Sequence, residues 1–250
     1  MALIVKQVLE GNNMQYLGGK SKIRKQLAEV LESYREPSQV YFEPFVGGGW
    51  VLQEVSGKRI ASDGNDALIA MYKALQGGWV PPDYVSEEDW RKYRQNKVCE
   101  KDPMQAFARF GCGFGGDWMG GYARSEGKSC YAATSKRSLL KQLPKIIDVD
   151  FRYGLYTDHS PENMLIYCDP PYEGTTQYGA FKEFDNNMFW QVMRDWSKNN
   201  TVLISEYQAP NDFECVGEFQ SQMGLSSKNS ANKVSREKRT EKLFKLKTER

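Results

Sequence analysis

An acid, two prolines and an aromatic residue stand together at Asp169-Pro170-Pro171-Tyr172. They follow the apolar run 164–168, which predicts a short buried strand. Two prolines cannot continue a strand ladder, so the chain must turn there. The turn offers a carboxylate, carbonyl oxygens and a ring at a strand end, where α/β sheets bind ligands. This set suits a flat group with an amine, such as adenine; the plain alternative is a Pro-Pro turn after a strand.

A glycine-rich turn and a second acid occur earlier in the sequence. Gly47-Gly48-Gly49 follows a predicted strand, and Asp63 ends the next one. Glycines let a backbone approach a ligand closely, and a carboxylate at the second strand end can bind both hydroxyls of a ribose. The turn is not a P-loop, because no Lys-Ser or Lys-Thr follows at the required offset. This order is typical of a nucleotide-binding α/β unit.

The elements that must position these residues alternate between strand and helix at both ends of the sequence, which predicts an α/β fold. Asn65 or Asp66, and later Asp185, are suitable helix N-caps, and Gly77-Gly78 ends the earlier helix. We expect helices over 23–31, 50–55, 66–76 and 186–196, and strands over 40–42, 58–61, 147–151, 164–168, 201–205 and 243–246.

Residues 80–145 interrupt this alternation. Pro81-Pro82 breaks the pattern, and Ser86 to Asp89 reads as a capping box that starts a helix. Asp102-Pro103 starts another helix, and 135–143 is also helical in pattern. We therefore expect one α/β domain made of 1–79 and 146–250, with a helical insertion at 80–145.

Composition excludes several classes of protein. No apolar stretch is long enough to cross a bilayer, and the N-terminus lacks the order of a signal peptide. The five cysteines form no Cys-x-x-Cys pair, which argues against a zinc site and a secreted disulfide framework. The sequence has a single histidine, His159, which argues against histidine-based acid–base catalysis and metal ligation. We expect a cytoplasmic protein with reduced thiols, no metal and no membrane contact.

In combination, the motifs resemble those of the Dam-like DNA adenine-N6 methyltransferases of the alpha group. The resemblance covers nearly the whole chain at motif level, with the insertion ahead of the Asp-Pro-Pro-Tyr turn as in that group. It implies a Rossmann-like methyltransferase sheet, a helical DNA-recognition insertion, and a restriction-modification or phage setting in a bacterial or phage-infected cell. The motifs are 16–20 (YLGGK), 43–49 (EPFVGGG), 63–65 (DGN), 169–172 (DPPY), 205–207 (SEY) and 241–243 (EKL).

The resemblance implies S-adenosyl-L-methionine as cofactor. Lys20 could pair with its carboxylate, and Asp63 would bind its ribose. The family often has an acid and an aromatic residue ahead of the strand before the catalytic turn. Here that pair is Leu155-Tyr156, so the acid is missing, and whether Asp158 replaces it is open. The implied cofactor contacts are Tyr16, Gly18, Gly19, Lys20, Pro44, Phe45, Gly47, Gly49, Asp63, Tyr156 and Asp169.

The implied catalytic residues are Asp169, Pro170, Pro171 and Tyr172. An adenine amine is a poor nucleophile because its lone pair is conjugated into the ring. The Asp169 carboxylate and the Pro170 carbonyl can each accept an N–H and favour the pyramidal nitrogen, without a covalent enzyme intermediate. The base must leave the duplex at a cost of a few kcal/mol. Tyr172 could return about 1–3 kcal/mol of this by stacking.

Double-stranded DNA is the implied partner, and the insertion is its expected reader. Cations can contact phosphates and guanine edges, and aromatic rings can wedge or stack. The alternative is an ordinary helical subdomain with a solvated face. The candidate DNA contacts are Arg109, Trp118, Tyr122, Arg124, Lys128, Lys136 and Arg137.

Two other functions stay open at this point. Related turns also serve cytosine N4 and RNA base amines, and a DNA-binding module could keep the glycines after losing catalysis. The intact Asp169 turn and Asp63 count against the second of these. Cytosine-C5 methylation needs a nucleophilic cysteine, usually after a proline, and no cysteine here follows one.

Overall fold

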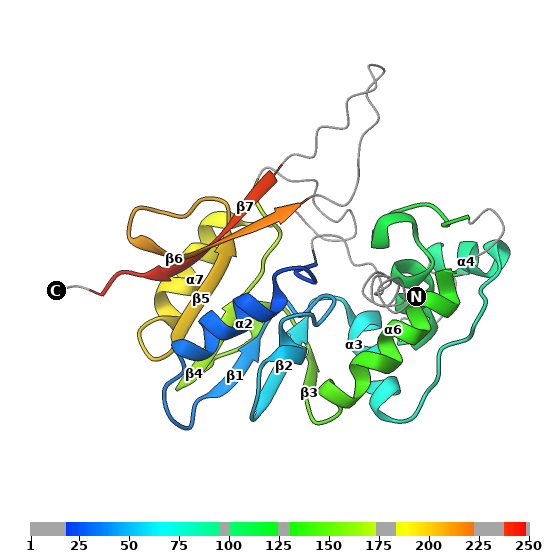
Figure 1. Cartoon of the computed structure of the whole chain (residues 1–250), viewed down its shortest axis with the longest axis horizontal. Helices are drawn as coiled ribbons and strands as arrows, with labels where there is room; N and C mark the ends of the chain where they lie inside the picture. Colours follow the sequence, from blue (N-terminus) through cyan, green and yellow to red (C-terminus); the bar gives the residue numbers. More distant parts are fainter. Residues whose placement is uncertain (1–18, 96–100, 125–130, 174–183, 223–237, 249–250) are drawn as a thin grey trace, which may run out of the picture.

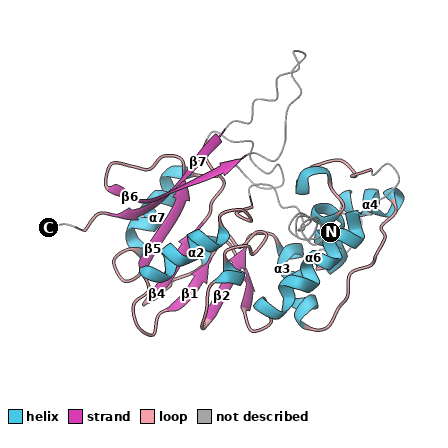
Figure 2. Cartoon of the chain, in the orientation of Figure 1, coloured by secondary structure: helices cyan, strands magenta, loops and turns pink. Residues whose placement is uncertain are grey.

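A computed structural model of the chain describes residues 19–95, 101–124, 131–173, 184–222 and 238–248. A seven-stranded sheet of order β3-β2-β1-β4-β5-β7-β6 forms its centre (Figures 1 and 2). Strands β1 to β5 are parallel, and β7 is antiparallel to both β5 and β6. Parallel strands in the order 3-2-1-4-5 are typical of Rossmann-like sheets, so the predicted α/β fold class is confirmed.

The strands lie close to the predicted ranges, with one addition. The sequence did not predict β6, which pairs only with β7 and contains a bulge between Cys215 and Gly217. The bulge disrupts the two-residue alternation that would reveal a strand. The strands are β1 (Val40–Glu43), β2 (Arg59–Asp63), β3 (Asp150–Tyr153), β4 (Met164–Cys168), β5 (Thr201–Glu206), β6 (Phe213–Gln222) and β7 (Lys238–Leu246).

Three predicted helix caps are present. Asn65, Ser86 and Asp185 each accept a backbone N–H of the first turn, at 3.1, 3.0 and 2.9 Å. The helices are α2 (Arg24–Ser33), α3 (Asp66–Gln76), α4 (Glu87–Arg94), α5 (Pro103–Ala106), α6 (Tyr131–Ile146) and α7 (Asn186–Trp196), with a π-helix at Phe107–Gly111 and 3₁₀ turns at Leu52–Glu54, Phe114–Gly116 and Tyr156–Asp158.

The helix predicted at 50–55 is wrong, because only the 3₁₀ turn Leu52–Glu54 forms there. Val55 is already extended, and Gly57 has a positive φ of 74°. The chain must therefore reverse into β2 before a full helical turn can develop.

Two apolar cores lie on the two faces of the sheet. Successive residues of a strand point to opposite faces of the sheet, so adjacent residues belong to different cores. One core joins the α2 side chains Leu27 and Leu31 to Tyr41 of β1. The other joins Phe189 of α7 to Phe42. This arrangement buries the central strands on both sides.

Helices α4, α5 and α6 lie in the chain between α3 and β3, and Figure 1 shows α3, α4 and α6 gathered beside the β3 edge. Phe107 and Leu139 of this segment share a core with Leu68 and Tyr72 of α3. The segment therefore packs directly on the α/β unit, and its predicted extent of 80–145 stays a prediction. Among the described helices, none is both long and apolar enough to span a bilayer.

Candidate active site

Four acids stand where parallel strands end. Glu43 ends β1, Asp63 ends β2, Asp169 follows β4 directly, and Glu206 ends β5. Because β1 lies between β2 and β4 and neighbouring strands are about 4.8 Å apart, the ends that carry Asp63 and Asp169 are separated by roughly 10 Å. Burial, with the charges of Asp169 and Asp63, raises the pKa of Glu43 well above its ordinary value. Asp63 and Asp169 therefore lie at the same end of the parallel strands, their carboxyl end.

Lys20 holds the predicted catalytic acid. Its Nζ lies 2.8 Å from Asp169 Oδ1 and 3.5 Å from Glu241 Oε2, and 4.8 Å from the centre of the Tyr172 ring. The side chain is 5% exposed. Burial alone would lower the pKa of this ammonium, but the charges of Asp169 and Glu241 raise it above its ordinary value. The sequence predicted a contact with a cofactor carboxylate; in the structure the ammonium lies on two carboxylates of the protein.

Glu206 supports the turn that follows Asp169. Its two carboxylate oxygens accept the backbone N–H groups of Glu173 at 3.2 Å and Tyr207 at 2.7 Å. The ring of Tyr207 meets Tyr172 edge-on at 4.8 Å. The sequence analysis did not assign Glu206 a role, although an acid directly at a strand end was a signal for one.

We expect the stability of the protein to depend on pH through Glu206. Burial raises the pKa of Glu206 to about 7, above the value of about 4.3 for an unfolded chain. The folded state therefore binds the proton more tightly, and the free energy of unfolding falls as pH rises from about 4.5 to 7. Glu206→Gln should reduce this fall. Urea denaturation at pH 5 and 7.5 measures it, and equal pH dependence of both proteins would contradict it.

The glycine turn is tied to Asp63. The N–H groups of Gly47 and Asn65 donate to its two oxygens at 3.0 and 2.9 Å. Burial raises the pKa of Asp63 to about 6, and these two hydrogen bonds oppose the rise. Gly47 and Gly49 have positive φ values of 45° and 62°. Glycine is favoured at both positions because other residues rarely adopt this backbone.

Two side chains that the sequence analysis missed hold the same turn. Tyr72 donates its hydroxyl to Gly47 O at 2.8 Å, and Gln142 donates its amide to Gly48 O and Gly49 O at 3.0 Å each. A Cβ on Gly49 would lie 3.1 Å from Gln142 Nε2 and 3.3 Å from Tyr72 Oη. This close approach is a second reason for glycine at position 49.

An aromatic cluster adjoins the turn. The ring of Phe45 lies 5.4 Å from that of Tyr156, and Phe189 contacts both. Pro44 is buried beside it. Asp158, the possible substitute for the missing family acid, is exposed and accepts Leu155 N–H at 2.8 Å, so it caps its own 3₁₀ turn. The structure thus brings Phe45 and Tyr156 together as the resemblance implies.

Three predicted residues cannot be compared. Tyr16, Gly18 and Lys128 lie outside the described residues, whereas Gly19 is exposed next to Lys20. Pro170 is buried, and Pro171 and Tyr172 are partly buried.

Two residues predicted to contact DNA are buried in the structure. Arg109 is 4% exposed and donates to Trp118 O at 3.0 and 2.7 Å, with its guanidinium 3.9 Å from the Trp118 ring centre. Burial lowers the pKa of Arg109 to about 10. Trp118 is buried as well. The pair therefore joins the π-helix at Phe107–Gly111 to the loop that follows it, because a guanidinium over an indole ring can be buried when a carbonyl accepts its hydrogen bonds.

The other candidate DNA contacts differ in exposure. Tyr122 is partly buried and donates to Val85 O at 2.8 Å. Lys136 pairs with Asp83 at 2.8 Å. Arg124 and Arg137 are exposed; Arg124 pairs with Glu87 and Arg137 donates to Thr134 Oγ1. Contacts with DNA stay a prediction for these four residues.

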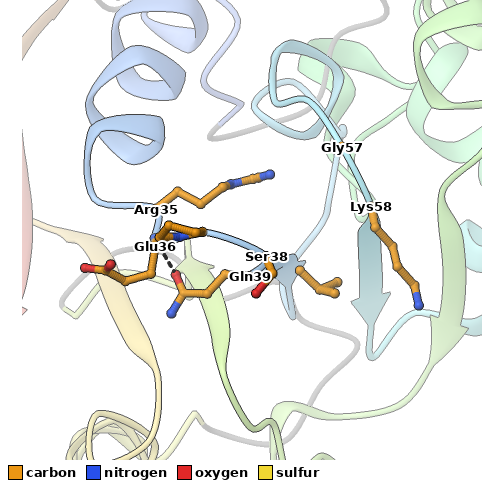
Figure 3. A pocket seen from close by; sticks show the side chains of 8 residues that line it. Arg35, Glu36, Ser38, Gln39, Gly57 and Lys58 are labelled. Atoms are coloured by element: carbon orange, nitrogen blue, oxygen red, sulfur yellow. Dashed lines mark hydrogen bonds between the residues drawn. The ribbon is translucent and has the colours of Figure 1, made fainter.

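A pocket of about 460 Å³ lies elsewhere on the molecule (Figure 3). It is lined by residues just before β1 and β2, so it opens at the amino ends of these strands, opposite to the acids described above. Glu36 N–H donates to Gln39 Oε1 across its rim at 3.0 Å. The residues that line the pocket are Arg35, Glu36, Pro37, Ser38, Gln39, Val40, Gly57 and Lys58.

In the described part of the chain, no group of three or more His, Cys, Asp or Glu side chains could hold a metal ion.

Comparison with known proteins gives one family and one curated relative. Residues 16–97 match the family model of the D12 class N6 adenine-specific DNA methyltransferases. The chain is 23% identical over 214 residues to the type II methyltransferase M.MjaIII of Methanocaldococcus jannaschii, covering 70% of this chain and 74% of the relative.

Solved structures that resemble the chain include two methyltransferases. One is a candidate RNA methyltransferase from Pyrococcus horikoshii, with 8% identity, a TM-score of 0.40, and coverage of 89% of this chain and 80% of that one. The other is a candidate methyltransferase in complex with SAH, with 10% identity, a TM-score of 0.34, and coverage of 93% and 54%. The fold assignment rests on the strand order of the sheet.

Proposed function

We infer that this chain, an adenine-specific DNA methyltransferase of the D12 class, transfers a methyl group from S-adenosylmethionine to adenine N6 within a specific sequence of duplex DNA. The observation that carries the proposal is the placement of Asp169 and Asp63 at strand ends on either side of β1. The first acid would face the amine and the second the cofactor ribose. We further propose that the enzyme acts on DNA inside a bacterial or phage-infected cell.

The residues at the glycine turn fit S-adenosylmethionine. Asp63 presents a carboxylate at the end of β2, and each oxygen keeps a lone pair beyond its bond to a backbone N–H. The half-buried ring of Phe45 and that of Tyr156 offer an apolar surface for an adenine. The bound cofactor would supply an electrophilic methyl group on a sulfonium.

Asp169 is the proposed acceptor of the substrate amine. Lys20 Nζ lies 2.8 Å from Asp169 Oδ1, and a carboxylate can only accept hydrogen bonds. With the Pro170 carbonyl it would accept the two N–H groups of N6 and free the nitrogen lone pair for in-line attack. The site contributes position and preorganised charge, and no bond forms between enzyme and substrate.

The adenine must leave the duplex to reach Asp169, since N6 is otherwise held in the base stack. Tyr172 follows Asp169 directly and is partly exposed, so its ring is the proposed stacking surface for the extruded base. The helical segment 80–145 is the proposed target-recognition insertion, with Arg124 and Arg137 among its exposed cations.

Product analysis tests the proposal. Purified protein is incubated with unmethylated duplex DNA and S-adenosylmethionine carrying a deuterated methyl group, and the DNA is digested to nucleosides for mass spectrometry. Deuterated N6-methyl-2′-deoxyadenosine is the expected product. Label in N4-methyl-2′-deoxycytidine, or label only when RNA replaces DNA, would contradict the assignment. The Asp169→Asn protein serves as the blank.

A further inference from the structure

Helix α6 belongs to the helical segment between α3 and β3, yet it reaches the glycine turn. Near its start, Ser135 donates its hydroxyl to Gly111 O at 2.8 Å, a contact within the segment. Two helical turns later, Gln142 donates to Gly48 O and Gly49 O. One helix thus contacts both the segment proposed to recognise DNA and the turn proposed to bind the cofactor.

The contacts of Gln142 control the orientation of peptide groups. An amide nitrogen carries two hydrogens, so Nε2 can serve both carbonyls at once, and Tyr72 holds the preceding carbonyl of Gly47. In a trans peptide, the carbonyl of one residue and the N–H of the next lie in one plane and point in opposite directions. Fixing three successive carbonyls therefore fixes three peptide planes of the turn.

The end of α6 is anchored, which gives Gln142 a fixed position. Arg59 donates to Lys145 O at 2.8 Å, and Gln76 donates to Ile146 O at 2.9 Å. Gln142 itself is 4% exposed. A buried donor with two carbonyl partners and an anchored backbone has little freedom to move.

We propose that Gln142 is a positioning residue for the cofactor, through which the helical segment shapes the glycine turn. The inference rests on the proposed function, because it assigns the turn to cofactor binding. By linkage, anything that displaces α6 when DNA binds must change cofactor affinity, and cofactor must change DNA affinity by the same factor.

The test compares Gln142→Met with Gln39→Met. Each variant keeps the length of a buried side chain and removes two side-chain hydrogen bonds, but Gln39 lies at the amino ends of the strands, where it bonds Glu36 N and Thr201 Oγ1. Calorimetric titration with S-adenosylhomocysteine should give a dissociation constant about tenfold higher for Gln142→Met. Gln39→Met should stay within about twofold of the wild type.

Tyr72→Phe is a milder second variant. It loses only the bond to Gly47 O and keeps the ring stacked on Phe151 at 4.6 Å, so it should fold normally and weaken binding about threefold.

In steady-state assays, Gln142→Met should raise the KM for S-adenosylmethionine and leave kcat near wild type, as expected when a ground-state contact is lost.

Two results would overturn the inference while the proposed function stands: wild-type affinity in both Gln142→Met and Tyr72→Phe, or an equal loss in Gln39→Met, which would indicate general destabilisation. If the wild-type protein itself fails to bind S-adenosylhomocysteine, the proposed cofactor is wrong and the inference falls with it. The two failures are therefore distinguishable.

Discussion

Asp169→Asn is expected to reduce the rate of methyl transfer by at least about 10³-fold while leaving the protein folded and able to bind cofactor. Asparagine keeps the shape of the side chain but replaces one acceptor oxygen by a donor and removes the charge that Lys20 pairs with at 2.8 Å. The asparagine amide can no longer offer the substrate amine a charged carboxylate oxygen as acceptor. Single-turnover transfer with saturating cofactor and DNA measures the loss.

Asp169→Asn tests the catalytic role more specifically than Asp169→Ala does. Asp169→Ala removes the nearer of the two carboxylates described beside the 5% exposed Lys20 and leaves Glu241 at 3.5 Å, so it should also destabilise the fold by up to about 3 kcal/mol. Asp102→Asn makes the same chemical change at the N-cap of α5, where asparagine caps equally well, and should keep both activity and stability. Turnover of Asp169→Asn within tenfold of wild type would remove Asp169 from the reaction.

Asp63→Ala is expected to weaken the binding of S-adenosylhomocysteine about 100-fold and to change DNA affinity far less. Hydrogen bonds to a charged group are worth about 1.5–3 kcal/mol, and the ribose would lose its carboxylate partner. Gly47 and Asn65 would also lose the acceptor that holds the turn. Calorimetry with S-adenosylhomocysteine and a fluorescence titration with duplex DNA measure the two affinities.

A pH series tests whether cofactor binding needs the charged carboxylate of Asp63. With its pKa near 6, Asp63 gains a proton as pH falls through that value, and affinity for S-adenosylhomocysteine should fall with it. Asp63→Asn should bind weakly at every pH from 5 to 8, without this inflection. Unchanged affinity in Asp63→Ala would place the ribose elsewhere.

Local signals in the sequence predicted most of the scaffold. Caps such as Asn65 and Ser86 act within three residues, and apolar runs indicate burial directly, so both can be recognised in the sequence alone. The acid-Pro-Pro-Tyr turn could be recognised for the same reason, because proline restricts the backbone wherever it occurs.

Contacts between distant residues were not predicted. Nothing in the periodicity of 131–146 indicates that Gln142 reaches the glycine turn, and nothing near Lys20 indicates Glu241 as its second partner. The burial of Arg109 was not predicted either, because a cation beside glycines suggests exposure, whereas here a tryptophan ring and a carbonyl enclose it. Such pairings follow from the tertiary packing of the chain, which no local sequence pattern reports.

Lys20 and Glu241 are far apart in the sequence, yet the Lys20 ammonium contacts both Asp169 and Glu241. β7, which carries Glu241, lies between β5 and β6 in the sheet. Any fragment of the protein without β7 therefore lacks both the strand that joins β6 to β5 and the second carboxylate beside Lys20. The charged surroundings of Asp169 are complete only when segments from distant parts of the sequence have come together.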